Sequence, residues 1–182
     1  MKDYITTFTK IHFNPLEPNA EDICIQDIAH ALSMMTRANG HFPEFYSIAQ
    51  HSIHCAQEAV ARNFTNRTVL ACLLHDASEA YLSDITRPVK RRMLKYKQYE
   101  RVLQSAIYEK FLPGEITPEE KVRVKAIDDT LLFFEFKHYM QEDLEKPREL
   151  LYSNPIFEVR NFEDVEREYL DIFYKFQTFH KK

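Results

Sequence analysis

The chain has 182 residues, of which 45% are hydrophobic and 29% charged, and its formal net charge is −4. This length and composition are those of a single globular domain with one buried core, and they exclude a disordered or fibrous protein. Only two glycines occur, which excludes a glycine-rich phosphate loop and a dinucleotide-binding fingerprint. Because hairpin-rich β proteins also depend on glycine, the composition favours helices.

The sequence predicts a cytoplasmic protein with no membrane or nucleic-acid partner. The first residues lack the apolar segment of a secretory signal, and no apolar run reaches the roughly 18 to 20 residues of a membrane span. The mild acidity and the lack of a basic stripe with interleaved aromatic residues argue against nucleic-acid binding. The cysteines lack CxxC spacing and lie in apolar segments, so we expect reduced core residues at Cys24, Cys55 and Cys72.

Apolar residues recur at helical spacing along most of the chain, after an irregular lead-in over residues 1–20. The fifth predicted helix has a clear start, because Thr117-Pro118-Glu119-Glu120 combines an N-cap, a proline and a reciprocal acid. The sequence thus predicts an all-α domain, a single helical bundle over residues 1–182 with about six helices. Their expected ranges are 23–35, 47–62, 69–74, 88–111, 117–140 and 161–180.

His75 and Asp76 follow the most apolar run of the chain, residues 70–74. Burial of an uncompensated carboxylate costs several kcal/mol, so Asp76 needs a cation, hydrogen-bond donors or an altered protonation state. A divalent metal bound by both side chains would satisfy that need. The alternative is a local ion pair at a helix end that reaches solvent.

Two further side chains lie on apolar stripes of the predicted helices. His51 lies within the stripe of helix 47–62, whereas His54 falls on the opposite side, which we expect to face water. Asp128 lies on the stripe of helix 117–140, and unlike Asp129 it has no obvious pairing with Lys125. A lone His51 would be read as a core histidine. Three helices that together carry two histidines and two acids predict a mixed nitrogen and oxygen metal site with open positions, as in catalytic sites.

This ordered set resembles the H…HD…D pattern of the HD-domain metal-dependent phosphohydrolases. The segment His75–Lys90 (HDASEAYLSDITRPVK) is closely similar to that of the bacterial 5′-deoxynucleotidase group within this superfamily. Tyr46–Ser52 (YSIAQHS) also resembles that group and its phage-encoded relatives. The resemblance covers roughly residues 25–140. It implies an enzyme in which one divalent ion polarises a phosphate oxygen and lowers the pKa of a bound water. The implied ligands are His51, His75, Asp76 and Asp128.

The resemblance also implies roles beyond the metal. Glu79, four residues after His75, would exchange protons as a general acid or base from the same helix face. Asp84 would lie near the sugar of a nucleotide, and Arg37 and Lys90 would contact its phosphate. The chain departs from the deoxynucleotidase pattern at Ala38, where that group has an aromatic residue, so a preference for deoxyribonucleotides does not follow.

The sequence therefore favours hydrolysis of nucleoside 5′-monophosphates, with deoxyribonucleotides among them. Two alternatives stay open, namely a hydrolase of another nucleotide such as a pyrophosphate or cyclic dinucleotide, and a metal-binding regulatory module without turnover. A two-iron oxygenase is disfavoured because further histidine and carboxylate ligands are lacking. The ion would be manganese, cobalt, iron, nickel, zinc or magnesium. The resemblance also favours a homodimer, to which the aromatic residues of the last helix could contribute: Tyr169, Phe173, Tyr174, Phe176 and Phe179.

Overall fold

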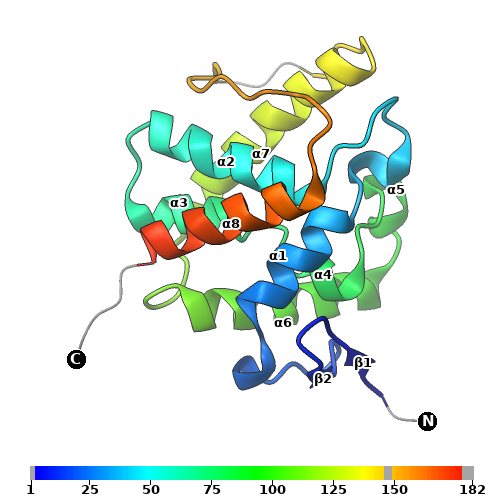
Figure 1. The fold of residues 1–182 in the computed structure, drawn as a ribbon. Coiled ribbons are helices and arrows are strands. Elements are labelled where there is room, and N and C mark those ends of the chain that lie inside the picture. The colour runs from blue at the N-terminus through cyan, green and yellow to red at the C-terminus, as the bar shows by residue number, and fades with distance from the viewer. Residues whose placement is uncertain (1–2, 146–148, 178–182) are drawn as a thin grey trace.

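The computed structural model describes residues 3–145 and 149–177, and this part of the chain is mainly helical, which confirms the all-α prediction (Figure 1). Within the described ranges, eight α-helices replace the six expected. None of them, within the described ranges, combines the length and apolarity that a bilayer crossing requires. In chain order they are α1 (Ile25–Met34), α2 (Ile48–Ala61), α3 (Asn66–Leu73), α4 (Glu79–Leu82), α5 (Arg87–Lys90), α6 (Leu94–Phe111), α7 (Pro118–Tyr139) and α8 (Phe162–Phe176).

The lead-in is more ordered than predicted. Strands β1 (Ile5–Thr6) and β2 (His12–Phe13) pair antiparallel, and Ile5 lies opposite Phe13. Phe13 is buried and its ring lies 4.4 Å from that of Tyr81 in α4. This short hairpin therefore packs on the helical core through Phe13, and its turn contacts α1, where Phe8 stacks on His30 and Thr9 donates hydrogen bonds to Asp27.

Helix α2 lies in the middle of the bundle and contacts α1, α3, α7 and α8 (Figure 1). It begins with a capping box, in which Ser47 and Gln50 satisfy each other's backbone N–H groups. His51 is fully buried, as its place in the apolar stripe predicts. The prediction that His54 faces water is wrong, since only 4% of it is exposed. Helix α8 packs on α2, and residues within 149–160 cover the side of α2 that carries His54 and Glu58.

The chain leaves the helical conformation directly before the predicted metal-binding doublet. Helix α3 ends at Leu73, and residues 74–78 form a turn that carries His75 and Asp76. Glu79 then begins the separate helix α4. The prediction that His75 and Glu79 share a helix face is therefore wrong.

The remaining boundaries fall near their predicted places, with two exceptions. The predicted basic helix is interrupted between α5 and α6, because Met93 adopts non-helical backbone angles, φ −100° and ψ 76°. Helix α8 starts after the N-cap Asn161 and ends at Phe176, not at residue 180. Of the aromatic residues expected there, Tyr169 and Phe173 are buried and Tyr174 is exposed, while Phe179 lies outside the described residues. The cysteines are free as predicted, and Cys55 and Cys72 are buried.

Candidate metal centre

Four side chains from three separate segments meet at one end of the bundle core. His51 comes from α2, His75 and Asp76 from the turn after α3, and Asp128 from α7. The Nε2 atoms of the two histidines are 3.2 Å apart. Asp76 Oδ2 lies 3.2 Å from Nε2 of His75 and 3.9 Å from that of His51. Asp128 Oδ1 lies 3.4 Å from Nε2 of His51 and 3.8 Å from that of His75. The structure thus brings the four predicted ligands together.

In each histidine, the ring nitrogen Nδ1 lies within hydrogen-bond distance of an acceptor oxygen. Nδ1 of His51 lies 2.5 Å from Oε1 of Glu135, and Nδ1 of His75 lies 2.7 Å from the carbonyl oxygen of Cys72. A carbonyl or an ionised carboxylate only accepts, so both Nδ1 atoms carry the proton and donate it. In their neutral forms the two rings consequently turn their acceptor nitrogens, Nε2, toward the same point, an arrangement typical of metal-binding histidines.

This convergence of acceptor atoms requires positive charge between them. Burial alone would lower the pKa of His75, but the neighbouring carboxylates Asp76 and Asp128 raise this pKa well above its usual value. Burial alone would raise the pKa of Asp76, but His75 and Arg37 hold it well below the usual range. The site therefore favours ionised acids facing a cationic centre, and a divalent ion would supply the charge that protons on the imidazoles otherwise provide.

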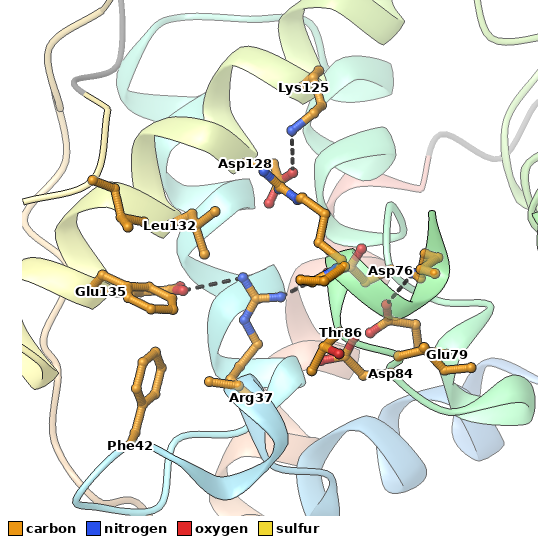
Figure 2. Close-up of a pocket in the computed structure, with 17 residues that line it drawn as sticks. Arg37, Phe42, Asp76, Glu79, Asp84, Thr86, Lys125, Asp128, Leu132 and Glu135 are labelled. Atoms are coloured by element: carbon orange, nitrogen blue, oxygen red, sulfur yellow. Dashed lines mark hydrogen bonds and ion pairs between the residues drawn. The ribbon is translucent and has the colours of Figure 1, made fainter. Parts of the chain in front are cut away.

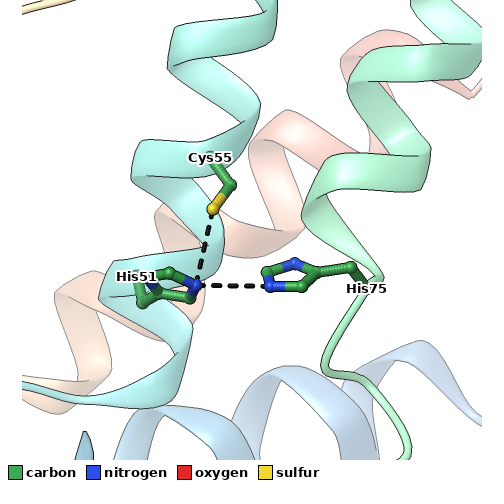
Figure 3. Close-up of side chains that lie close together, drawn as sticks. All are labelled: His51, Cys55 and His75. Carbon is green, nitrogen blue, oxygen red and sulfur yellow. Dashed lines mark hydrogen bonds between the residues drawn. The ribbon is translucent and has the colours of Figure 1, made fainter. Parts of the chain in front are cut away.

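A cysteine completes a second possible donor set at this place (Figure 3). Cys55 lies one turn after His51 on α2, and its Sγ atom is 3.5 Å from His51 Nε2. The cluster of His51, Cys55 and His75 could hold a metal ion. Burial, followed by the charges of nearby acids, raises the pKa of the Cys55 thiol well above its usual value, so a metal ion would have to displace the thiol proton to bind there. The sequence interpretation treated Cys55 as core and overlooked this contact.

A cavity of about 470 Å³ opens beside the two carboxylates, and both Asp76 and Asp128 line it (Figure 2). One wall is apolar, including Phe42, Leu132 and Phe136, and the remainder carries acids and cations. Every residue that the sequence assigned to substrate binding or proton transfer lines it as well. These are Arg37, Glu79, Asp84 and Lys90.

Arg37 projects from the loop before α2 into this cavity. The two residues that follow it, Ala38 and Asn39, both have φ of 51°, a left-handed conformation that turns the chain sharply. The guanidinium donates to Asp76 Oδ2 at 3.3 Å and to Glu135 Oε2 at 3.2 Å (Figure 2). Arg37 is thereby fixed between the metal-facing acid and a second carboxylate from α7.

Glu79 lies on the other side of the cavity and is 5% exposed. Burial raises the pKa of its carboxyl well above the usual range, and the charges of Asp76 and Asp84 raise it further. Lys90 contacts Glu79 Oε1 at 3.4 Å and Glu100 at 2.6 Å. The other oxygen, Oε2, is buried and has no hydrogen-bond partner within the described chain. Glu79, which lines the cavity, thus keeps one unused hydrogen-bonding position at Oε2.

Asp128 differs from the sequence prediction in one respect. Lys125 contacts two neighbouring acids of α7, Asp128 through Oδ2 at 3.1 Å and also Asp129. The prediction that Asp128 lacks a local partner is wrong, because residues three apart on a helix are neighbours too. Lys125 occupies only Oδ2, so Oδ1 stays directed at the histidines.

Glu135 is a site residue that the sequence interpretation missed. It lies on α7 seven residues after Asp128 and is 0% exposed. Burial opposes its ionisation, but His51 and Arg37 lower its pKa to about 2. A signal was present, because Glu135 continues the apolar stripe that runs through Val124 and Leu131.

Two uncharacterized bacterial proteins are similar to the chain. YfdR of Escherichia coli strain K12 is 42% identical over 108 residues, which cover 59% of this chain and 58% of that protein. A protein of Rhodobacter capsulatus is 38% identical over 120 residues, covering 62% of this chain and 61% of that protein. The chain thus spans about three fifths of the length of these relatives, and their names carry no activity. No family model matches the chain.

Proposed function

We propose that the protein is a metal-dependent phosphohydrolase of the HD-domain type, which hydrolyses nucleoside 5′-monophosphates to nucleoside and phosphate. One observation carries the proposal. Four donor atoms from His51, His75, Asp76 and Asp128 converge at the wall of a cavity that also holds a half-buried arginine and a buried glutamate. A purely structural ion pair would need neither the cavity nor the two additional groups.

The four side chains fit a divalent cation because they supply two imidazole nitrogens and two carboxylate oxygens, a set suited to borderline and hard ions. Such an ion, when bound, polarises a phosphate oxygen and makes water a stronger nucleophile. The protein orients the donors through Glu135 and the Cys72 carbonyl, which hold the two imidazole rings from behind. We favour Asp76 and Asp128 as ligands over the Cys55 thiol, because the two acids are ionised and the thiol is not.

Arg37 binds the phosphate in this proposal. A guanidinium offers parallel N–H donors that match phosphate oxygens, and Arg37 has its fork at the mouth of the site already. Lys90 adds a second positive charge at 22% side-chain exposure, held by Glu79 and Glu100. Two cations beside a metal would balance the charge of a phosphate monoester dianion.

Glu79 is the general acid. Burial raises the pKa of its carboxyl and so favours the protonated form, and departure of a sugar alkoxide requires a proton. The apolar wall with Phe42 and Phe136, whose rings meet edge to face at 5.4 Å, offers a surface for a flat base. Asp84, also at the cavity, contacts the sugar in the proposed enzyme. A homodimer is part of the same proposal, by resemblance.

A phosphate-release screen of nucleotides tests the proposal. The purified protein is stripped with chelator, and Mn²⁺, Co²⁺, Fe²⁺, Ni²⁺, Zn²⁺ and Mg²⁺ are restored one at a time. We expect release of phosphate from nucleoside monophosphates only with metal, and no metal uptake by Asp76→Ala. A protein that binds metal but releases no phosphate from any nucleotide would contradict the proposal.

A further inference from the structure

Glu135 is the most enclosed acid next to the candidate site, and the proposed reaction uses it only to hold the His51 ring. Its side chain is 0% exposed, so it cannot touch bulk water. The carboxylate nevertheless meets three partners. Oε1 lies 2.5 Å from Nδ1 of His51 and accepts from the Tyr46 hydroxyl at 3.2 Å, while Oε2 accepts from Arg37 at 3.2 Å.

The two oxygens of Glu135 therefore face different parts of the site. Oε1 holds the ring of His51 from the side opposite Nε2, the atom that faces His75 and the two aspartates. Oε2 holds one arm of the Arg37 guanidinium, while the other arm reaches Asp76. A single rigid carboxylate thus fixes the positions of a metal-facing nitrogen and a phosphate-facing cation relative to each other.

A second layer of side chains fixes Glu135 itself. Tyr46 is 0% exposed, and its hydroxyl lies 2.8 Å from Nδ1 of His54. Burial lowers the pKa of His54 to about 4, so His54 is neutral and its Nδ1–H can donate to the tyrosine oxygen. The tyrosine in turn donates to Glu135. This chain of hydrogen bonds has one direction and ends on Oε1.

We propose that Glu135 is the positioning residue of the site, which holds His51 for the metal and Arg37 for the phosphate at the same time. The inference rests on the proposed function, because it takes the metal and phosphate sites as given. Outer partners of metal-binding histidines commonly contribute 10- to 100-fold to metal affinity. Glu135 differs from such a partner in serving the anion-binding group as well.

Glu135→Gln is the sharpest substitution, since it keeps the shape but leaves one acceptor oxygen where the carboxylate has two. The amide cannot accept from His51 and from Arg37 together, and its NH₂ group must face one of these donors. We expect the affinity for Mn²⁺, measured by calorimetry on metal-stripped protein, to fall roughly 10- to 100-fold. We also expect weaker binding of inorganic phosphate to the protein saturated with Mn²⁺.

Glu58→Gln is the matched control. Glu58 is likewise 0% exposed and pairs with an arginine, Arg62, but it lies at the other end of α2. We expect this variant to lower the thermal unfolding midpoint and to leave both affinities within about twofold of the wild type. If Glu135→Gln keeps wild-type affinity for both Mn²⁺ and phosphate, or if Glu58→Gln weakens them equally, the inference is wrong.

A measurement on the wild type covers the case in which Glu135→Gln does not fold. In the protein saturated with Zn²⁺, ¹⁵N NMR of the imidazoles should find the proton of His51 on Nδ1, within a hydrogen bond to a carboxylate. A proton on Nε2 would overturn the inference. The proposed function alone would be wrong if the wild-type protein binds Mn²⁺ and phosphate but hydrolyses no nucleotide. Wild-type protein that binds no metal overturns both.

Discussion

Two carboxylate centres lie beside the two ends of helix α2, and they are organised in opposite ways. Near its end, Glu58 accepts hydrogen bonds from Arg62 Nε at 2.7 Å, from the backbone N–H groups of Tyr152 and Ser153, and from the Ser153 hydroxyl at 2.6 Å. Three of these four donors are neutral. The carboxylate is saturated by the protein itself, and it fastens the segment after residue 149 to the bundle.

Near the beginning of α2 the acids outnumber the cations that hold them. Within the described chain, Asp76, Asp128 and Glu135 share only Arg37 and Lys125 as permanently charged partners beside the two histidines, and all three acids line the cavity. A carboxylate in a structural role receives all its donors from the chain, whereas here the chain concentrates acceptors and leaves the charge to a ligand. The difference separates an anchor from a binding site.

The largest effect expected is at Asp128, because removal of its charge would remove a metal ligand. The metal affinity of Asp128→Asn should fall by more than roughly 10- to 100-fold, the usual loss when a residue that hydrogen-bonds a metal ligand is removed. Metal content after dialysis, measured by mass spectrometry, checks this result. Asp129→Asn is the control on the same helix, since Asp129 also contacts Lys125 but has a side chain 46% exposed. Equal metal loss in both variants would remove the distinction between the two acids.

Glu79→Gln should come next, with metal retained and kcat lowered by roughly 10²- to 10⁴-fold, the usual contribution of a general acid. The amide fills the same space but cannot release a proton. Lys90 also pairs with Glu100, so Glu100→Gln disturbs the same lysine without touching the cavity and should retain most of the activity. Full turnover in Glu79→Gln would exclude Glu79 as the acid.

Arg37→Lys preserves the positive charge but replaces the fork by a single ammonium. Loss of a hydrogen bond to a charged group costs about 1.5–3 kcal/mol, so KM should rise roughly 10- to 150-fold with a smaller change in kcat. Arg87→Lys serves as the control at the rim, where the side chain is 56% exposed. An unchanged KM in Arg37→Lys would mean that phosphate is bound elsewhere.

Much of the fold could be predicted because the signals are local. The capping sequence at Thr117 and the N-cap Asn161 lie one residue before α7 and α8 begin. The break at Met93 could not be predicted, since the apolar periodicity continues through it. The end of α3 at Leu73 lies one residue from its predicted place, but the turn that separates His75 from Glu79 in α4 was missed, because a buried turn and a buried helix have the same composition.

Only some of the residues of the candidate site could be predicted from the sequence. His51 and Asp128 were recognisable as polar side chains on apolar stripes, and the structure brings them together. Glu135 followed the same rule but was not predicted, because it lies outside the segments that resemble the family motif. The burial of His54 could not be foreseen, since it depends on α8 and on a segment about 100 residues later in the chain.

At the other carboxylate centre, Glu58→Gln should lower the free energy of unfolding by about 1–3 kcal/mol. Burial opposes ionisation, but the donors from Ser153, Arg62 and Tyr152 lower the pKa of Glu58 below its usual value of 4.5. The stabilisation is thus fully present above that pH and is lost as the pH falls through the folded pKa. Urea unfolding at about pH 7 and pH 3.5 should show the gap between wild type and variant closing. A gap independent of pH would mean that the charge of Glu58 is not what anchors the segment.

The smallest effect is expected at Cys55, where it decides between the two donor sets. If the two aspartates hold the metal, Cys55→Ser should change Mn²⁺ affinity by less than about threefold, within the contribution of one ordinary hydrogen bond. If the thiol were a ligand, Zn²⁺ affinity would fall much more than Mn²⁺ affinity, because thiolates select softer ions. The ratio of the two affinities therefore identifies the donor set. Cys72→Ser is the matched control, since Cys72 is also buried but donates to no part of the cluster. A Zn²⁺-specific loss in Cys55→Ser alone would assign the centre to His51, Cys55 and His75, and the aspartates would then be free to contact the substrate.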